Sequence, residues 1–144
     1  MNCQIFKHDS NSLKPFLRLF MISLLSFLFG CSRSDIREGG LYCTPAEQGG
    51  YSILKILKID EAGVHIRAYS NHYAIPPKKI DEAALYMVGV DRKPEETLGL
   101  GHVPISKKSF SQWKIKFVQQ SSVREEELEG FNMWLEAEAG YFDW

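Results

Sequence analysis

Two neighbouring apolar segments joined by a short polar turn constrain the fold of this chain more than any other feature. Tyr51–Asp60 is rich in apolar residues that fit either a strand or a helical spacing. Two glycines precede this segment and the turn Asp60-Glu61-Ala62-Gly63 follows it, which favours a strand. Val64–Tyr69 then alternates between apolar and polar residues. The pattern predicts an antiparallel hairpin, with His65 and Arg67 on its solvent face.

The next part of the chain predicts further short elements. Ala84–Val90 is apolar and predicts a third strand, and a polar loop over residues 91–101 follows it. Ser106 is placed to cap a short helix that presents Phe110 and Trp113 to the core. Residues 114–118 alternate and predict a last strand.

The C-terminal segment predicts a helix. Ser122 and Glu125 have the spacing of a capping box, and the acidic run Glu125–Glu129 suits the first turn and a solvated helix face. Gly130 inside the helix indicates close packing, and Gly140 is expected to end the helix. The residues predicted on the buried face are Leu128, Phe131, Trp134 and Leu135. The predicted fold is therefore mainly β with α: a small bent antiparallel sheet or an SH3-like barrel with a C-terminal helix.

An apolar run near the N-terminus bears on location. Basic side chains precede Leu19–Gly30, which has the length of a secretory signal and, at roughly 18 Å as a helix, is short for a membrane span. The tetrapeptide Leu28-Phe29-Gly30-Cys31 resembles the lipobox of bacterial lipoproteins. That resemblance implies cleavage between Gly30 and Cys31, lipid on the Cys31 thiol and a periplasm-facing, membrane-anchored protein. Ser32 in place of aspartate favours the outer over the inner membrane.

The corresponding organisation is a signal peptide over residues 1–30, a tether over residues 31–40 and one globular domain over residues 41–144. Two alternatives stay open for the N-terminal run: a buried helix with an incidental cysteine, and secretory cleavage without lipid. Three of the 17 basic and one of the 18 acidic residues precede the cut, so the remainder has a net charge near −3. Nucleic acid is therefore not an expected partner. Cys43 is left as a lone thiol and is expected to be buried.

Candidate chemistry is sparse. No histidine or cysteine spacing fits a zinc site, no cofactor motif is found, and no catalytic residue is assigned. Gly99-Leu100-Gly101-His102 is expected to form a turn, because the sequence context of a phosphate loop is missing. The aromatic and histidine side chains that are candidates for binding a partner are Tyr69, His72, Tyr73 and His102.

Several segments also resemble a group of small uncharacterised bacterial proteins. They are Val64–Tyr69, Gly99–Ser106 with Phe110 and Trp113, and Glu126–Phe131 with Trp134. The resemblance covers most of residues 40–142 and implies a type of domain without an activity.

The sequence thus predicts a non-catalytic binding module of the cell envelope. Its most specific form is an immunity-type protein that neutralises a toxin. The alternative is an envelope maintenance or assembly lipoprotein that binds a membrane protein or cell-wall glycan. A hydrolase using His72 or His102 is a third hypothesis, without a visible set of nucleophile, base and orienting group.

Overall fold

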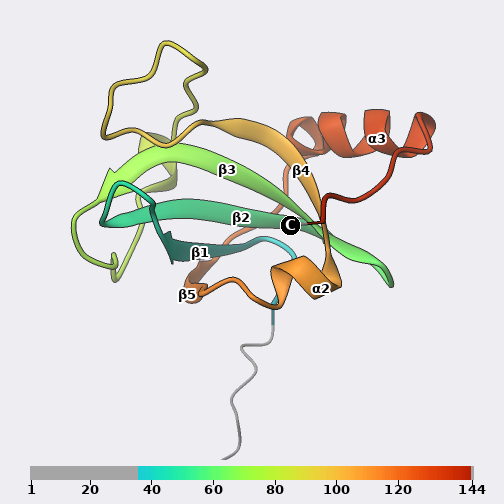
Figure 1. The fold of residues 1–144 in the computed structure, drawn as a ribbon, viewed down its shortest axis with the longest axis horizontal. Coiled ribbons are helices and arrows are strands. Elements are labelled where there is room, and N and C mark those ends of the chain that lie inside the picture. The colour runs from blue at the N-terminus through green and yellow to red at the C-terminus, as the bar shows by residue number, and fades with distance from the viewer. Residues whose placement is uncertain (1–35, 144) are drawn as a thin grey trace, which may run out of the picture. The chain divides into compact units, whose positions relative to one another are not determined.

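The computed structural model describes residues 36–143, whose strands form one open, curved sheet (Figure 1). All of its strand pairs are antiparallel, and the spatial order is β4-β3-β2-β1-β5. The strands are β1 (Gly40–Pro45), β2 (Tyr51–Ile59), β3 (Gly63–Tyr73), β4 (Leu100–Ser106) and β5 (Lys116–Gln120). The predicted class, mainly β with α, is confirmed in its bent-sheet form. The barrel alternative is wrong because β4 and β5 remain separate edges.

The predicted hairpin is β2 and β3, with Ile59 opposite Val64. Asp60 shapes the turn, because its Oδ1 accepts hydrogen bonds from the backbone N–H of Ala62 at 2.9 Å and of Gly63 at 2.8 Å. This local capping of the turn by an aspartate explains why the sequence was sufficient to locate it.

The segment before β1 belongs to the folded domain. The Gly39 N–H donates to the Ile56 carbonyl at 2.8 Å, and the Arg37 N–H donates to the Tyr42 hydroxyl at 3.0 Å. Ile36 packs against the core. Residues 36–40 are therefore not the tether that was predicted there. The rest of that tether, the signal peptide with Gly30, and Cys31 lie outside the described residues.

The predicted third strand is wrong. Residues 82–84 form a 3₁₀ turn, η1 (Glu82–Ala84). The chain then passes beside the C-terminal part of β3 without forming a regular strand. The Ser70 N–H donates to the Tyr86 carbonyl at 2.9 Å, and the Ser70 hydroxyl accepts from the Val88 N–H at 2.8 Å. β4 pairs with β3 along this edge, so Gly99–His102 is not the predicted turn: Leu100, Gly101 and His102 are the first residues of β4.

The short helix α2 (Lys107–Phe110) confirms the Ser106 cap, whose hydroxyl accepts from the Ser109 N–H at 3.2 Å. Phe110 is buried and Trp113 packs against the core, as predicted. The last strand, β5, begins two residues later than predicted and pairs with β1.

The C-terminal segment contains η2 (Glu125–Leu128) followed by α3 (Glu129–Glu136). Ser122 is not its cap: the N-cap is Arg124, and the Glu127 carboxylate accepts from the Arg124 N–H at 2.9 Å. The helix ends at Glu136, before Gly140, and Leu135 is exposed rather than on a buried face. No helix within residues 36–143 is both long and apolar enough to cross a membrane.

Alternating strand residues build a core on each face of the sheet. One core contains Tyr42, Leu54 and Ile56, and the other contains Leu41, Cys43 and Ile53. Cys43 is buried as predicted, and burial raises the pKa of its thiol, so it remains protonated.

The close packing predicted at Gly130 is confirmed and yields a test. A Cβ added at Gly130 would lie 2.5 Å from the Cβ of His102 on β4. We expect Gly130→Ala to lower the free energy of unfolding by about 1–2 kcal/mol, because overpacking outweighs the helix propensity of alanine. Chemical denaturation would measure this change. Gly101→Ala, where an added Cβ meets nothing within 4 Å, is the control. A more stable Gly130→Ala variant would contradict the close approach.

Candidate functional site

The four residues predicted to bind a partner do not form one surface. Tyr69 is buried, and its hydroxyl donates to Glu127 at 3.2 Å. Tyr73 packs on the same core as Tyr69, and His72 is half-buried with its ring over Gly50. His102 belongs to a different cluster, on β4. The structure therefore gives no support to a single aromatic binding site made by these four side chains.

His102 and His65 form the centre of a polar chain inside the domain. The His65 Nδ1 lies 2.9 Å from the His102 Nε2, and the His65 Nε2 lies 3.0 Å from the Asp60 Oδ2. Tyr141 donates its hydroxyl to the same carboxylate oxygen. This polar chain joins the β2–β3 turn and β3 to β4 and to the C-terminal tail, which lie further along the sequence.

The predicted exposure of His65 is wrong, since its side chain is completely buried. His65 does lie on the face opposite Val64, as the alternation requires, but the C-terminal segment covers that face. Its ring centroid lies 4.8 Å from that of Phe131, 4.6 Å from that of Trp134 and 5.4 Å from that of Tyr141. The sequence pattern predicted solvent exposure for His65 because the residues that cover it, in the C-terminal segment, are far away along the sequence.

Hydrogen bonds link the members of this polar chain. Asp60 accepts from the His65 Nε2–H, and between the His65 Nδ1 and the His102 Nε2 one ring nitrogen donates and the other accepts, according to the tautomers. Burial by itself would raise the pKa of Asp60, but hydrogen bonds from Tyr141, His65 and the turn amides hold it well below its usual range. Burial and the neighbouring His65 lower the pKa of His102 to about 4. The cluster therefore holds a charged aspartate and a neutral His102 at physiological pH.

This arrangement is suited to holding the C-terminal segment in place. Among the hydrogen bonds of residues 36–143, no serine, threonine or cysteine contacts either histidine. The same residues contain no group of three or more histidine, cysteine, aspartate or glutamate side chains placed to hold a metal ion.

The lowered pKa of His102 predicts a pH dependence. Between its ordinary value of 6.5 and about 4, the unfolded chain takes up a proton at His102 that the folded chain refuses. Unfolding is thus favoured as the pH falls through this window, and the full stabilisation is present above it. We expect the melting temperature to fall as the pH decreases from 7 to about 4.5, and this dependence to weaken in His102→Gln. A His72→Gln control should keep it, whereas an unchanged profile in His102→Gln would contradict the assignment.

A second polar cluster fixes η2 to the sheet. The Lys55 Nζ on β2 lies 2.8 Å from the Glu127 Oε2, and the two side chains are 3 % and 1 % exposed. Burial opposes the charge on Glu127, but hydrogen bonds from the Arg124 N–H and Lys55 lower its pKa overall. The prediction of a solvated face for the whole Glu125–Glu129 run is wrong at Glu127.

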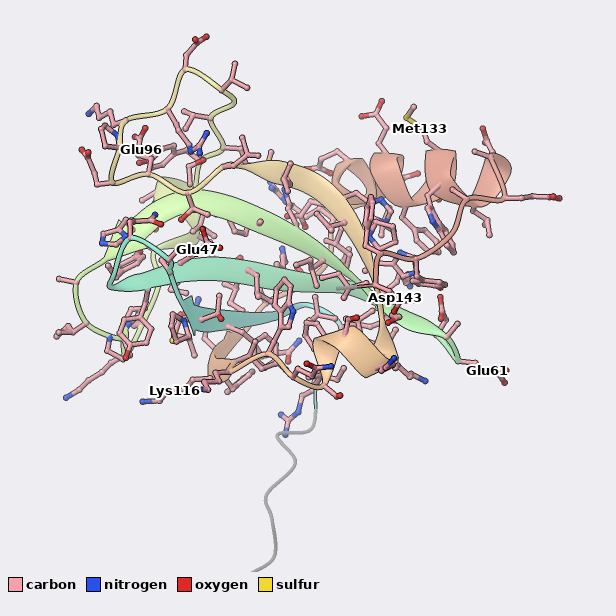
Figure 2. The ribbon with its side chains drawn as sticks, in the orientation of Figure 1. Glu47, Glu61, Glu96, Lys116, Met133 and Asp143 are labelled. Atoms are coloured by element: carbon pink, nitrogen blue, oxygen red, sulfur yellow. The ribbon has the colours of Figure 1, made fainter. Side chains whose placement is uncertain are left out.

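The outer surface of the C-terminal segment is acidic around an exposed methionine. We call this the acidic helix surface, and it comprises Glu125, Glu126, Glu129, Met133, Glu136 and Glu138, all of them exposed. Glu129, Met133 and Glu136 follow one another at helical spacing along one side of α3. Met133 is 64 % exposed, and Figure 2 shows it pointing away from the sheet. Leu135 is 59 % exposed but, two residues further along the helix, lies on a different side of α3. No lysine or arginine occurs between Glu125 and Asp143.

A cleft with a volume of about 610 Å³ lies at the other end of the sheet. Its apolar floor includes Leu54, Ile66 and Val103. Two loops border it, and Figure 2 labels one acidic side chain from each, Glu47 and Glu96. Its other charged lining residues are Arg92 and Lys93. Two acidic and two basic side chains therefore line the cleft, and their charges favour neither an anionic nor a cationic partner.

Comparison with known proteins adds no assignment: no family model matches the chain, and neither a curated protein nor a solved structure matches it.

Proposed function

We propose that this chain is a membrane-anchored lipoprotein whose folded domain is a non-catalytic binding module of the cell envelope, of the immunity type that neutralises a toxin. The observation that carries the proposal is the acidic helix surface, which offers exposed carboxylates around Met133. Such a surface complements a protein that presents basic side chains around an apolar patch. A basic toxin reaching the periplasm is a partner of that kind.

Rigid mounting of the surface supports the proposal. The buried Lys55–Glu127 pair and the His65 cluster attach both the start of the C-terminal segment and the residues after α3 to the sheet. A preorganised surface loses less conformational entropy on binding than a mobile one. The lipid expected on Cys31 would keep the domain at the membrane, since two or more acyl chains give stable anchoring.

The partner surface can be tested with charge reversal. The full-length protein is co-expressed with the product of the adjacent gene, and complex formation and survival of the cells are measured. We expect Glu129→Lys/Glu136→Lys to weaken the complex at least about tenfold and to abolish protection, through loss of charge complementarity. Glu61→Lys, an exposed glutamate on the β2–β3 turn, is the matched control. Equal protection by both variants, or the absence of any complex with the unmodified chain, would contradict the proposal.

The anchor requires a separate experiment. Metabolic labelling with a fatty acid should mark the unmodified chain and leave Cys31→Ala unlabelled, because the thiol is the only lipid acceptor proposed. A Cys31→Ala chain labelled as strongly as the unmodified one would remove the lipoprotein assignment without bearing on the acidic helix surface.

A further inference from the structure

A second cavity lies on the face of the sheet that the C-terminal segment covers. It has a volume of about 390 Å³, within the range of pockets that bind small molecules. Residues 82–87 form one wall, and β2, β3 and η2 supply the rest. Its lining residues are Lys55, Arg67, Tyr69, Glu82, Ala83, Leu85, Tyr86, Met87, Arg124 and Glu127.

Most charges of this cavity already have partners. Lys55 pairs with Glu127 at 2.8 Å. Glu82 accepts hydrogen bonds from Gln119, at 3.3 Å, and from the Ser121 hydroxyl. Arg124 pairs with Glu126 at 3.2 Å. Each of these charged side chains thus has an ion-pair or hydrogen-bond partner within the protein itself.

Arg67 is the exception. Its Nε is buried, and no group in residues 36–143 accepts a hydrogen bond from it. The interaction found for its guanidinium is with the Tyr69 ring, whose centroid lies 6.0 Å from the guanidinium carbon. No carboxylate of the described domain lies within ion-pair distance of it. A buried donor without an acceptor is costly, so a bound group that supplies an acceptor at this position would be stabilised.

We propose that this cavity binds a small organic carboxylate through Arg67, as a site independent of the acidic helix surface. A guanidinium offers a planar pair of donors that matches a carboxylate. The side chains of Ala83, Leu85 and Met87 give the apolar body of such a ligand a surface to contact. Three cationic and two anionic side chains line the cavity, so one added negative charge balances it. A dianion such as phosphate would leave the cavity with one negative charge in excess, which the carboxylates of Glu82 and Glu127 would repel.

Butyrate is a suitable probe, with butyramide as the uncharged analogue and inorganic phosphate as the dianion. The full-length protein in detergent micelles is titrated with each, following the Arg67 Nε–H resonance by NMR. We expect saturable butyrate binding that moves this resonance, no saturation with butyramide, and binding of phosphate at least about tenfold weaker.

Matched variants localise the site. Arg67→Gln should weaken butyrate binding at least about tenfold, and Arg67→Lys should recover only part of it, because the ammonium lacks the planar pair of donors. Arg92→Gln, on the rim of the other cleft, should bind as the unmodified chain does. Absence of saturation by butyrate, or equal binding by butyramide, overturns the proposal. If Arg67→Gln does not fold, the titration of the unmodified chain decides alone, since the Arg67 resonance either responds to butyrate or does not.

Discussion

Replacing Lys55 by alanine should lower the free energy of unfolding by about 3–5 kcal/mol, because it removes the closest and only buried counter-charge of the Glu127 carboxylate among the described residues. The two side chains are 3 % and 1 % exposed, so water cannot replace the lost partner without opening the contact between η2 and β2. Tyr69 and the Arg124 N–H would still donate to Glu127. The Arg124 guanidinium lies 3.7 Å from Glu127 Oε1, but it is 64 % exposed and therefore replaces only part of the lost positive charge. Equilibrium denaturation with urea measures the loss.

The same chain contains a matched control. Lys58 lies three residues further along β2 and pairs with Glu38 at 3.2 Å, but these side chains are 39 % and 42 % exposed. Lys58→Ala should therefore cost less than about 1 kcal/mol. The double variant Lys55→Met/Glu127→Leu should recover much of the stability lost in Lys55→Ala, because it removes both buried charges. Equal effects of Lys55→Ala and Lys58→Ala would show that the Lys55–Glu127 pair is hydrated in solution.

Local signals explain which parts of the fold could be predicted. The β2–β3 hairpin is formed by a four-residue turn in which the Asp60 carboxylate accepts hydrogen bonds from the backbone N–H groups of Ala62 and Gly63. The start of α2 is marked by the side chain of Ser106, which caps the helix. These features are complete within a few residues. By contrast, β1 and β4 are defined by pairing with strands elsewhere in the sequence. β1 lies between β2 and β5, and β4 pairs with β3 although a long connection separates the two strands. Nothing within Gly40–Pro45 or Leu100–Ser106 specifies those neighbours.

The polar clusters were missed for a related reason. The sequence around Glu127 is mostly acidic and suits an exposed first turn of a helix. What makes Glu127 different from the neighbouring glutamates is its ion pair with Lys55, which is far earlier in the sequence. His65 occupies a polar position of an alternating strand, where solvent exposure is the ordinary expectation. Gly130 was the one available signal, because a glycine inside a helix is unfavourable unless something approaches closely. The group that approaches Gly130 is the side chain of His102, beginning at its Cβ, and His102 belongs to the same cluster.

The two clusters have a common effect on the proposed partner surface. Lys55 and His65 lie on adjacent strands of the same sheet face and contact opposite ends of the C-terminal segment. The carboxylates around Met133 repel one another, so an isolated helix of this composition would be weak. The interior of the sheet therefore supplies the stability that allows an acidic surface to be displayed in one conformation.

Replacing His65 by alanine should test that relation, at a cost of about 3–5 kcal/mol, as for truncation of other buried rings. The substitution leaves a cavity bordered by Phe131, Trp134 and Tyr141 and removes the hydrogen-bond partner of the His102 Nε2. Urea denaturation measures the loss of stability. The fluorescence of Trp134 should shift to longer wavelength, because its ring would lose its closest aromatic neighbour and become hydrated.

His72→Ala is the control for this change, since it removes the same side chain from the same strand. His72 is only half-buried, and no described group accepts a hydrogen bond from or donates one to its buried Nδ1. Its loss should therefore cost about 1 kcal/mol or less and leave the Trp134 emission unchanged. If His65→Ala were as stable as His72→Ala, the C-terminal segment would not depend on the His65 cluster. The rigid presentation of the acidic helix surface would then have to rest on Lys55 and Glu127 alone.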